Sequence, residues 1–130
     1  MASNRSKVLI VEDDLSSQQY YEIILEDSYE LEIVTTVEES KEALLASEFS
    51  VAIVDLSLPG NENGIDLIKY IREKYPDKPI PIALTAHALP QSRKEALDAG
   101  AAEFFTKPIL NAVLIESIEK QIQSIKRRKG

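Results

Sequence analysis

Short apolar runs alternate with longer amphipathic segments along the whole chain of 130 residues. The first, third and fourth runs are mostly aliphatic without polar alternation, which is typical of strands covered on both faces. The second run alternates polar with apolar residues, which favours a place nearer the edge of a sheet. The predicted strands are Lys7–Glu12, Glu30–Thr35, Val51–Asp55, Ile80–Thr85 and Ala102–Thr106.

The segments between these runs predict helices. In the fourth, Pro90 is expected at the helix start and Gly100 just past its end, a standard pair of start and stop signals. The predicted helices are Ser16–Glu26, Glu38–Ser47 with a weak stripe of Lys41, Ala43 and Leu44, Gly64–Tyr75 with Ile68, Ile71 and Tyr75 on one face, Pro90–Ala99, and a last helix with the stripe Leu110, Leu114, Ile118, Ile122 and Ile125.

Strict alternation of strand and helix implies parallel strands joined by right-handed crossovers. We therefore expect an α/β fold, a doubly wound, five-stranded parallel sheet flanked by five helices. The length suits one domain over residues 1–130, with its core at about 7–125 and a short basic tail at Lys126–Lys129.

Composition excludes several functional classes. The net charge of −7 argues against a general nucleic-acid-binding surface, and the absence of cysteine excludes disulfides, thiol nucleophiles and cysteine-bound metals. No apolar run approaches the roughly 20 residues of a membrane span, and the N-terminus does not resemble a signal peptide, so a cytoplasmic location is expected.

Chemically active groups follow four of the five predicted strands. Glu12–Asp14 follows the first, Asp55 ends the third, Thr85 ends the fourth and Lys107 follows the fifth. The carboxyl ends of parallel strands meet at one edge, where such sheets bind ligands. Each residue taken singly is better explained as a helix cap, a turn or an ordinary strand residue. Their joint placement is what indicates a site.

Clustered carboxylates repel one another, so they must take up a proton or bind a cation. A set of oxygen ligands suits a hard ion such as Mg²⁺, which usually keeps several waters. Lys107 and Thr85 offer an ammonium and a hydroxyl to phosphoryl oxygens, and Asp55 can carry a phosphoryl group as an aspartyl phosphate. The sequence thus predicts a phosphoryl-transfer site with Asp55 as the nucleophile.

Four segments with matching order and spacing identify a family over essentially the whole chain. They are VLIVEDD at Val8–Asp14, VDLSLPG at Val54–Gly60, ALTAHA at Ala83–Ala88 and FFTKP at Phe104–Pro108. The chain resembles the receiver domain of two-component response regulators. The resemblance implies the strand order 2-1-3-4-5.

The resemblance also implies roles for individual residues. Asp55 would accept a phosphoryl group from a phosphohistidine, and Lys107 would contact a phosphoryl oxygen. Asp13 would bind Mg²⁺ directly, Glu12 mostly through a water, and Ser57 through its backbone carbonyl.

Further residues would transmit the effect of phosphorylation at Asp55 to the rest of the domain. Thr85 would move its hydroxyl toward the phosphoryl group, and Phe104 would follow it as the aromatic switch residue. Ala86 and His87 would lie at the rim of the site, and Pro108 would follow a cis peptide bond. The chain departs from the common pattern in the longer loop LSLPGNENG, where polar Asn61 suggests an altered loop conformation, and in Phe104, which lacks a tyrosine hydroxyl.

These features predict a phosphorylation-controlled signalling switch whose fourth helix, fifth strand and fifth helix form the output face. The expected partner is a sensor histidine kinase or a histidine phosphotransfer protein. The output partner, and the choice among a stand-alone regulator, a relay intermediate and a receiver of a hybrid kinase, stay open. We expect a monomer when unphosphorylated, with a phosphorylation-dependent dimer left open. We expect no direct nucleic-acid or membrane binding, and no enzymatic turnover beyond its own phosphorylation and dephosphorylation.

Three alternatives are weaker. A phosphohydrolase of the dehalogenase-like class would need an aspartate where Ser57 stands. An interaction module that takes no phosphate would be expected to lack Asp55, Lys107 or an acidic ligand. A dinucleotide-binding fold would need a glycine-rich loop after the first strand, where the chain has Glu12–Asp14 instead.

Overall fold

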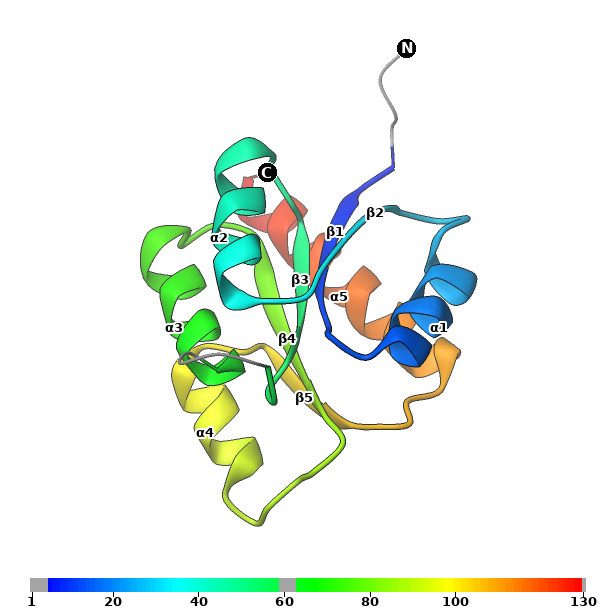
Figure 1. Ribbon diagram of the computed structural model, residues 1–130. Coiled ribbons are helices and arrows are strands. Elements are labelled where there is room, and N and C mark those ends of the chain that lie inside the picture. The colour runs from blue at the N-terminus through cyan, green and yellow to red at the C-terminus, as the bar shows by residue number, and fades with distance from the viewer. Residues whose placement is uncertain (1–4, 59–62, 130) are drawn as a thin grey trace.

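The computed structural model describes residues 5–58 and 63–129. Its centre is a parallel sheet in the order β2-β1-β3-β4-β5, as predicted (Figure 1). The edge position of β2 agrees with the polar alternation of that segment, and the aliphatic strands β1, β3 and β4 are interior. The strands are β1 (Lys7–Val11), β2 (Glu30–Val34), β3 (Val51–Asp55), β4 (Ile80–Thr85) and β5 (Glu103–Thr106).

Helices cover both faces of the sheet (Figure 1). One hydrophobic layer lies beneath α1 and α5, and a second lies beneath α2, α3 and α4. In the register of the central strands, Ile10 of β1 pairs with Ile33 of β2 and Ile53 of β3. The helices are α1 (Leu15–Leu25), α2 (Val37–Ala46), α3 (Gly64–Lys74), α4 (Ser92–Ala99) and α5 (Asn111–Lys129).

Side-chain caps and one glycine set where the helices begin after the strand ends. The Asp14 side chain caps α1 by accepting a hydrogen bond from the backbone N–H of Ser17, and Thr36 caps α2 in the same way. Gly64 begins α3 against the end of β3, where an added Cβ would lie 2.3 Å from the carbonyl oxygen of Asp55. Only glycine permits this close approach, so α3 starts directly beside the site-bearing strand end.

Several helix starts differ from prediction, and α1 and α2 each begin one residue earlier than expected, at Leu15 and Val37. Helix α4 begins at Ser92, not at Pro90, which lies in a turn before the N-cap residue Gln91. Helix α5 begins at Asn111, so Leu110 lies just before it and is 73% exposed. The buried stripe of α5 therefore starts at Leu114. Leu114, Ile118, Ile122 and Ile125 are buried as expected.

The inner faces of two other helices also differ in detail. Lys41 and Tyr75 are only partly buried, and the buried positions of α2 and α3 are Val37, Ser40, Ala43 and Leu44, and Gly64, Leu67, Ile68 and Ile71. The altered loop conformation that Asn61 suggests lies outside the described residues. Within residues 5–58 and 63–129, no helix combines the length and apolar character that crossing a bilayer requires.

Candidate functional site

The carboxyl ends of β1 and β3 bring three acids together. Val11 and Val54 are partners in the parallel ladder, so the residues that follow them, Glu12 and Asp55, lie at the same edge. Glu12 is 1% exposed and Asp55 is 6% exposed, whereas Asp13 is open to solvent. One carboxylate oxygen from each of these acids lies within 4.8 Å of the other two. The structure therefore gathers the acids that the sequence placed at two separate strand ends.

Lys107 supplies a cation to this acid cluster. Its Nζ lies 2.5 Å from Oε1 of Glu12, 3.4 Å from Oδ2 of Asp55 and 3.5 Å from Oγ of Ser17. The lysine backbone N–H donates to the carbonyl of Thr85 at 2.9 Å, which joins the ends of β4 and β5. The ammonium therefore pairs more closely with Glu12 than with Asp55.

Burial shapes the protonation of the site. Desolvation raises the pKa of Glu12, the negative Asp55 adds to this, and Lys107 only partly opposes it. For Lys107, burial acts to lower the pKa, but the hydrogen bond to Glu12 and the charge of Asp55 outweigh it, so the pKa is raised. The lysine is therefore protonated at neutral pH. The buried phenol of Tyr21 has a raised pKa for the same reasons, burial first and then the charges of Glu12 and Asp55.

The donor set of the cluster fits a hard divalent cation. Glu12, Asp13 and Asp55 offer carboxylate oxygens and no nitrogen or sulfur, and the exposure of Asp13 leaves room for bound water. The backbone N–H of Ser57 donates to Oδ1 of Asp55 at 3.0 Å and so holds that carboxylate in place. Three acids beside one lysine leave an excess of negative charge that a cation would balance.

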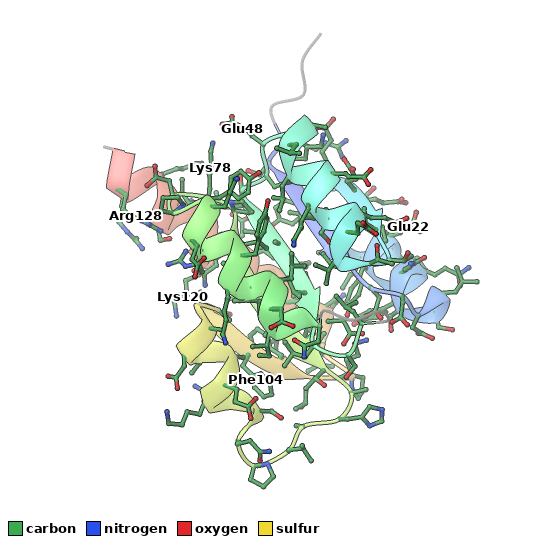
Figure 2. All side chains as sticks on the ribbon, turned by 60° about the vertical axis from the view of Figure 1, so that its left-hand side comes forward. Glu22, Glu48, Lys78, Phe104, Lys120 and Arg128 are labelled. Atoms are coloured by element: carbon green, nitrogen blue, oxygen red, sulfur yellow. The ribbon has the colours of Figure 1, made fainter. Side chains whose placement is uncertain are left out.

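The residues expected to transmit the effect of phosphorylation lie at the end of β4 and within β5. Thr85 is 2% exposed, and its Oγ1 accepts a hydrogen bond from the backbone N–H of His87 at 3.1 Å. Phe104, labelled in Figure 2, packs partly buried against the hydrophobic layer that includes Ala96 of α4. Ala86 and His87 are exposed, and the peptide bond before Pro108 is cis, as the resemblance implied.

Sequence reasoning missed the contribution of α1. Gln18 Nε2 donates to the carbonyl of Glu12 at 2.6 Å, and the hydroxyl of Tyr20 donates to the carbonyl of Ile109 at 2.7 Å. With Ser17, these side chains lie over the carboxyl edge of the sheet. Their polar character six to nine residues after β1 was the available signal, but the sequence does not say which loop they meet.

An open, largely apolar groove lies between α1 and the loop that joins β5 to α5. It has a volume of about 560 Å³, and we call it the α1–loop groove. Leu15 at the start of α1 is 66% exposed, and Leu110 on the groove wall is 73% exposed. The lining residues are Ser16, Ser17, Tyr20, Tyr21, Ala86, Lys107, Pro108, Ile109 and Leu110.

Residues 8–119 match the response regulator receiver domain family. The chain belongs to this family. It is 33% identical to the response regulator protein PilR of Pseudomonas aeruginosa over 82% of the chain, and 32% identical to the transcriptional regulatory protein BasR of Escherichia coli over 94%. The matched regions make up 24% of PilR and 53% of BasR, so the chain spans at most about half of these two relatives.

Solved receiver domains share the fold. The CheY-like response regulator receiver domain protein from Methanospirillum hungatei superimposes with a TM-score of 0.88 at 27% identity, covering 96% of this chain and 99% of that one. Receiver domains are phosphorylation-controlled signalling domains of two-component systems, and this receiver domain has that general function. The fold class, the strand order and the family predicted from the sequence are thereby confirmed.

Proposed function

We propose that Asp55 of this receiver domain accepts a phosphoryl group from a phosphohistidine on a partner protein. The supporting observation is the surrounding of the Asp55 carboxylate, which is nearly buried, is held by the N–H of Ser57 and faces the ammonium of Lys107 at 3.4 Å. Asp13 and Asp55 would hold Mg²⁺ directly, with Glu12 acting mostly through a water and Ser57 through its carbonyl. Bound there, the ion would neutralise charge on the phosphoryl oxygens.

In this reaction an Asp55 carboxylate oxygen attacks phosphorus in line with the bond to the histidine nitrogen. The new O–P bond forms as the P–N bond breaks, and the imidazole leaves with the bonding electron pair and takes up a proton. Lys107 contacts a phosphoryl oxygen, which requires its ammonium to turn from Glu12 toward Asp55. Attack of water on phosphorus later returns the free carboxylate. On this proposal the protein is a phosphoacceptor that catalyses only its own phosphorylation and dephosphorylation.

The phosphoryl group would act on the output face through Thr85 and Phe104. Thr85 must exchange the hydrogen bond from His87 for one to a phosphoryl oxygen, which draws the loop between β4 and α4 toward the site. Phe104 then turns further into the space beside α4. The changed surface of α4, β5 and α5 would be read by a downstream protein.

The α1–loop groove is the proposed docking surface for the histidine-bearing partner. It opens beside Lys107, so a helix lying in it would carry its histidine close to Asp55. The exposed side chains of Tyr20 and Leu110, which line it, provide the contact area. The partner would be a sensor histidine kinase or a histidine phosphotransfer protein, and the unphosphorylated receiver domain is proposed to be a cytoplasmic monomer.

Incubation with acetyl phosphate and Mg²⁺, followed by intact-mass measurement, tests the assignment. We expect one added phosphoryl group, none without Mg²⁺ and none in Asp55→Asn. Asp27→Asn, a change of an exposed aspartate in a turn, is the matched control and should be labelled like the native chain. An addition that survives Asp55→Asn would refute the role of Asp55. Steady hydrolysis of a small phosphate ester, well beyond one equivalent, would instead support a phosphohydrolase.

A further inference from the structure

The hydroxyl of Tyr20 connects two parts of the site that are distant in sequence. It donates to the carbonyl of Ile109 at 2.7 Å, so the middle of α1 is bonded to the loop between β5 and α5. Ile109 lies two residues beyond Lys107, and its side chain is 7% exposed. The loop that carries Lys107 is thus held at the core by Ile109, at β4 through Thr85 and at α1 through Tyr20.

Helix α1 is in turn fixed to the acidic side of the site. Gln18 donates to the carbonyl of Glu12 at 2.6 Å, and Ser17 lies 3.5 Å from the ammonium of Lys107. The separation between the loop and α1 therefore sets how far Lys107 lies from Glu12 and Asp55. A lysine ammonium sits on a flexible four-carbon stem, so its position depends strongly on where its backbone is held.

We propose that Tyr20 is a positioning residue for phosphoryl transfer, acting through the hydrogen bond of its hydroxyl to the loop that carries Lys107. The inference rests on the proposed function of Asp55 and Lys107. Connecting loops on a protein surface are mobile unless they are held. Without the hydroxyl, the loop would sample positions in which the ammonium is too far from Asp55 to contact a phosphoryl oxygen.

The first measurement follows the loop itself. Tyr20→Phe removes the hydroxyl and keeps the ring, and a neutral hydrogen bond of this kind corresponds to about a three- to tenfold change in an equilibrium. We expect amide hydrogen exchange at Lys107, whose N–H donates to the carbonyl of Thr85, to accelerate by about that factor. Tyr70→Phe, at a half-buried tyrosine on α3 on the opposite side of the sheet, should leave it unchanged. Unchanged exchange in Tyr20→Phe would overturn the proposal.

The second measurement asks whether Tyr20 acts through Lys107. Initial rates of Asp55 phosphorylation by acetyl phosphate with Mg²⁺ are compared in the native chain, Tyr20→Phe, Lys107→Ala and the double variant. We expect Tyr20→Phe to slow the reaction about three- to tenfold when Lys107 is present and to have no further effect in Lys107→Ala. A merely structural role would slow both chains equally.

The outcomes separate this proposal from the function on which it rests. If the native chain is phosphorylated at Asp55 and Tyr20→Phe reacts at the native rate, the role of Tyr20 is refuted and the function stands. Equal slowing in the presence and absence of Lys107 also refutes the positioning role. If the native chain takes no phosphoryl group, both proposals fail.

Discussion

Charged side chains pair at both ends of the sheet, but in very different surroundings. At the carboxyl end, Lys107 lies 2.5 Å from Glu12, and their side chains are 17% and 1% exposed. At the amino end, Lys78 before β4 lies 3.9 Å from Glu48 before β3, and their side chains are 26% and 86% exposed. Figure 2 labels Glu48 and Lys78 close together, on the surface of the molecule.

Because the two ion pairs differ in burial, they differ in what they contribute to stability. An exposed ion pair in water contributes about 0–1 kcal/mol to stability, so the Lys78–Glu48 pair has little consequence. A buried pair must offset a desolvation cost of several kcal/mol for each ion. Apolar residues in its place often give the folded protein equal stability. Glu12 and Asp55 share one lysine. A sheet edge that served only structure would not need two buried acids and a partly buried lysine. Stability does not explain this arrangement, whereas the proposed binding of a cation and a phosphoryl group would.

The largest expected effect comes from removing the buried cation. Lys107→Met leaves Glu12 and Asp55 together without a positive partner, and breaking a buried pair in this way costs about 3–5 kcal/mol. We expect a loss near the lower end, about 3 kcal/mol, because the carboxyl of Glu12 can take up a proton. Urea denaturation at pH 7 in the presence of EDTA measures it.

Lys78→Met is the matched control at the opposite end of the sheet, and its effect should stay below about 1 kcal/mol. Similar losses from the two lysine variants would show that burial does not distinguish the two edges. The buried charges at the carboxyl edge would then give no indication of a ligand site.

The sequence predicted the cluster at the carboxyl edge because the parallel topology followed from the alternation of strands and helices. Once the strands are parallel, Glu12, Asp55, Thr85 and Lys107 must share an edge whatever the loops do. The strand order came from the resemblance. The period of the apolar residues could not locate the start of α5, so Leu110 was predicted inside a stripe that begins at Leu114.

The details within the site could not be predicted in the same way. Lys107 has a long, flexible stem and two buried acids within reach, and its ammonium lies closer to Glu12 than to Asp55. The contact of Tyr20 with Ile109 joins residues 89 positions apart, and no local pattern encodes it. Packing sets these contacts, whereas strand ends are set by topology.

The next largest effect concerns cation binding. Mg²⁺ at about ten times its dissociation constant should raise the free energy of unfolding by about 1.4 kcal/mol, because only the folded chain gathers the acids. Asp13→Asn should lose this stabilisation. Glu48→Gln, which removes an acid from the opposite edge, should keep it. Thermal denaturation with increasing Mg²⁺ gives the measurement, and equal Mg²⁺ stabilisation of the two variants would refute a site at the carboxyl edge.

A smaller effect is expected from pH. The pKa of Glu12 is raised above its ordinary value near 4.5 in the folded chain, mainly by burial. Its contribution to stability is therefore fully present below pH 4.5 and is lost as the pH rises through the raised pKa. In EDTA, the free energy of unfolding of the native chain should fall relative to that of Glu12→Gln between pH 4.5 and 7. The opposite slope would mean that Lys107 outweighs burial at this carboxyl.

The smallest effect should come from the exposed acid at the amino end. Glu48→Gln removes one charge of a pair separated by 3.9 Å, whose carboxylate is almost fully solvated. The expected change in the free energy of unfolding is within about 0.5 kcal/mol, and it should shrink further in high salt, because exposed charges are screened. Urea denaturation at low and high ionic strength measures it. A loss as large as that of Lys107→Met would mean that the Lys78–Glu48 pair is stabilising despite its exposure, and that charge pairs at either edge can serve structure alone.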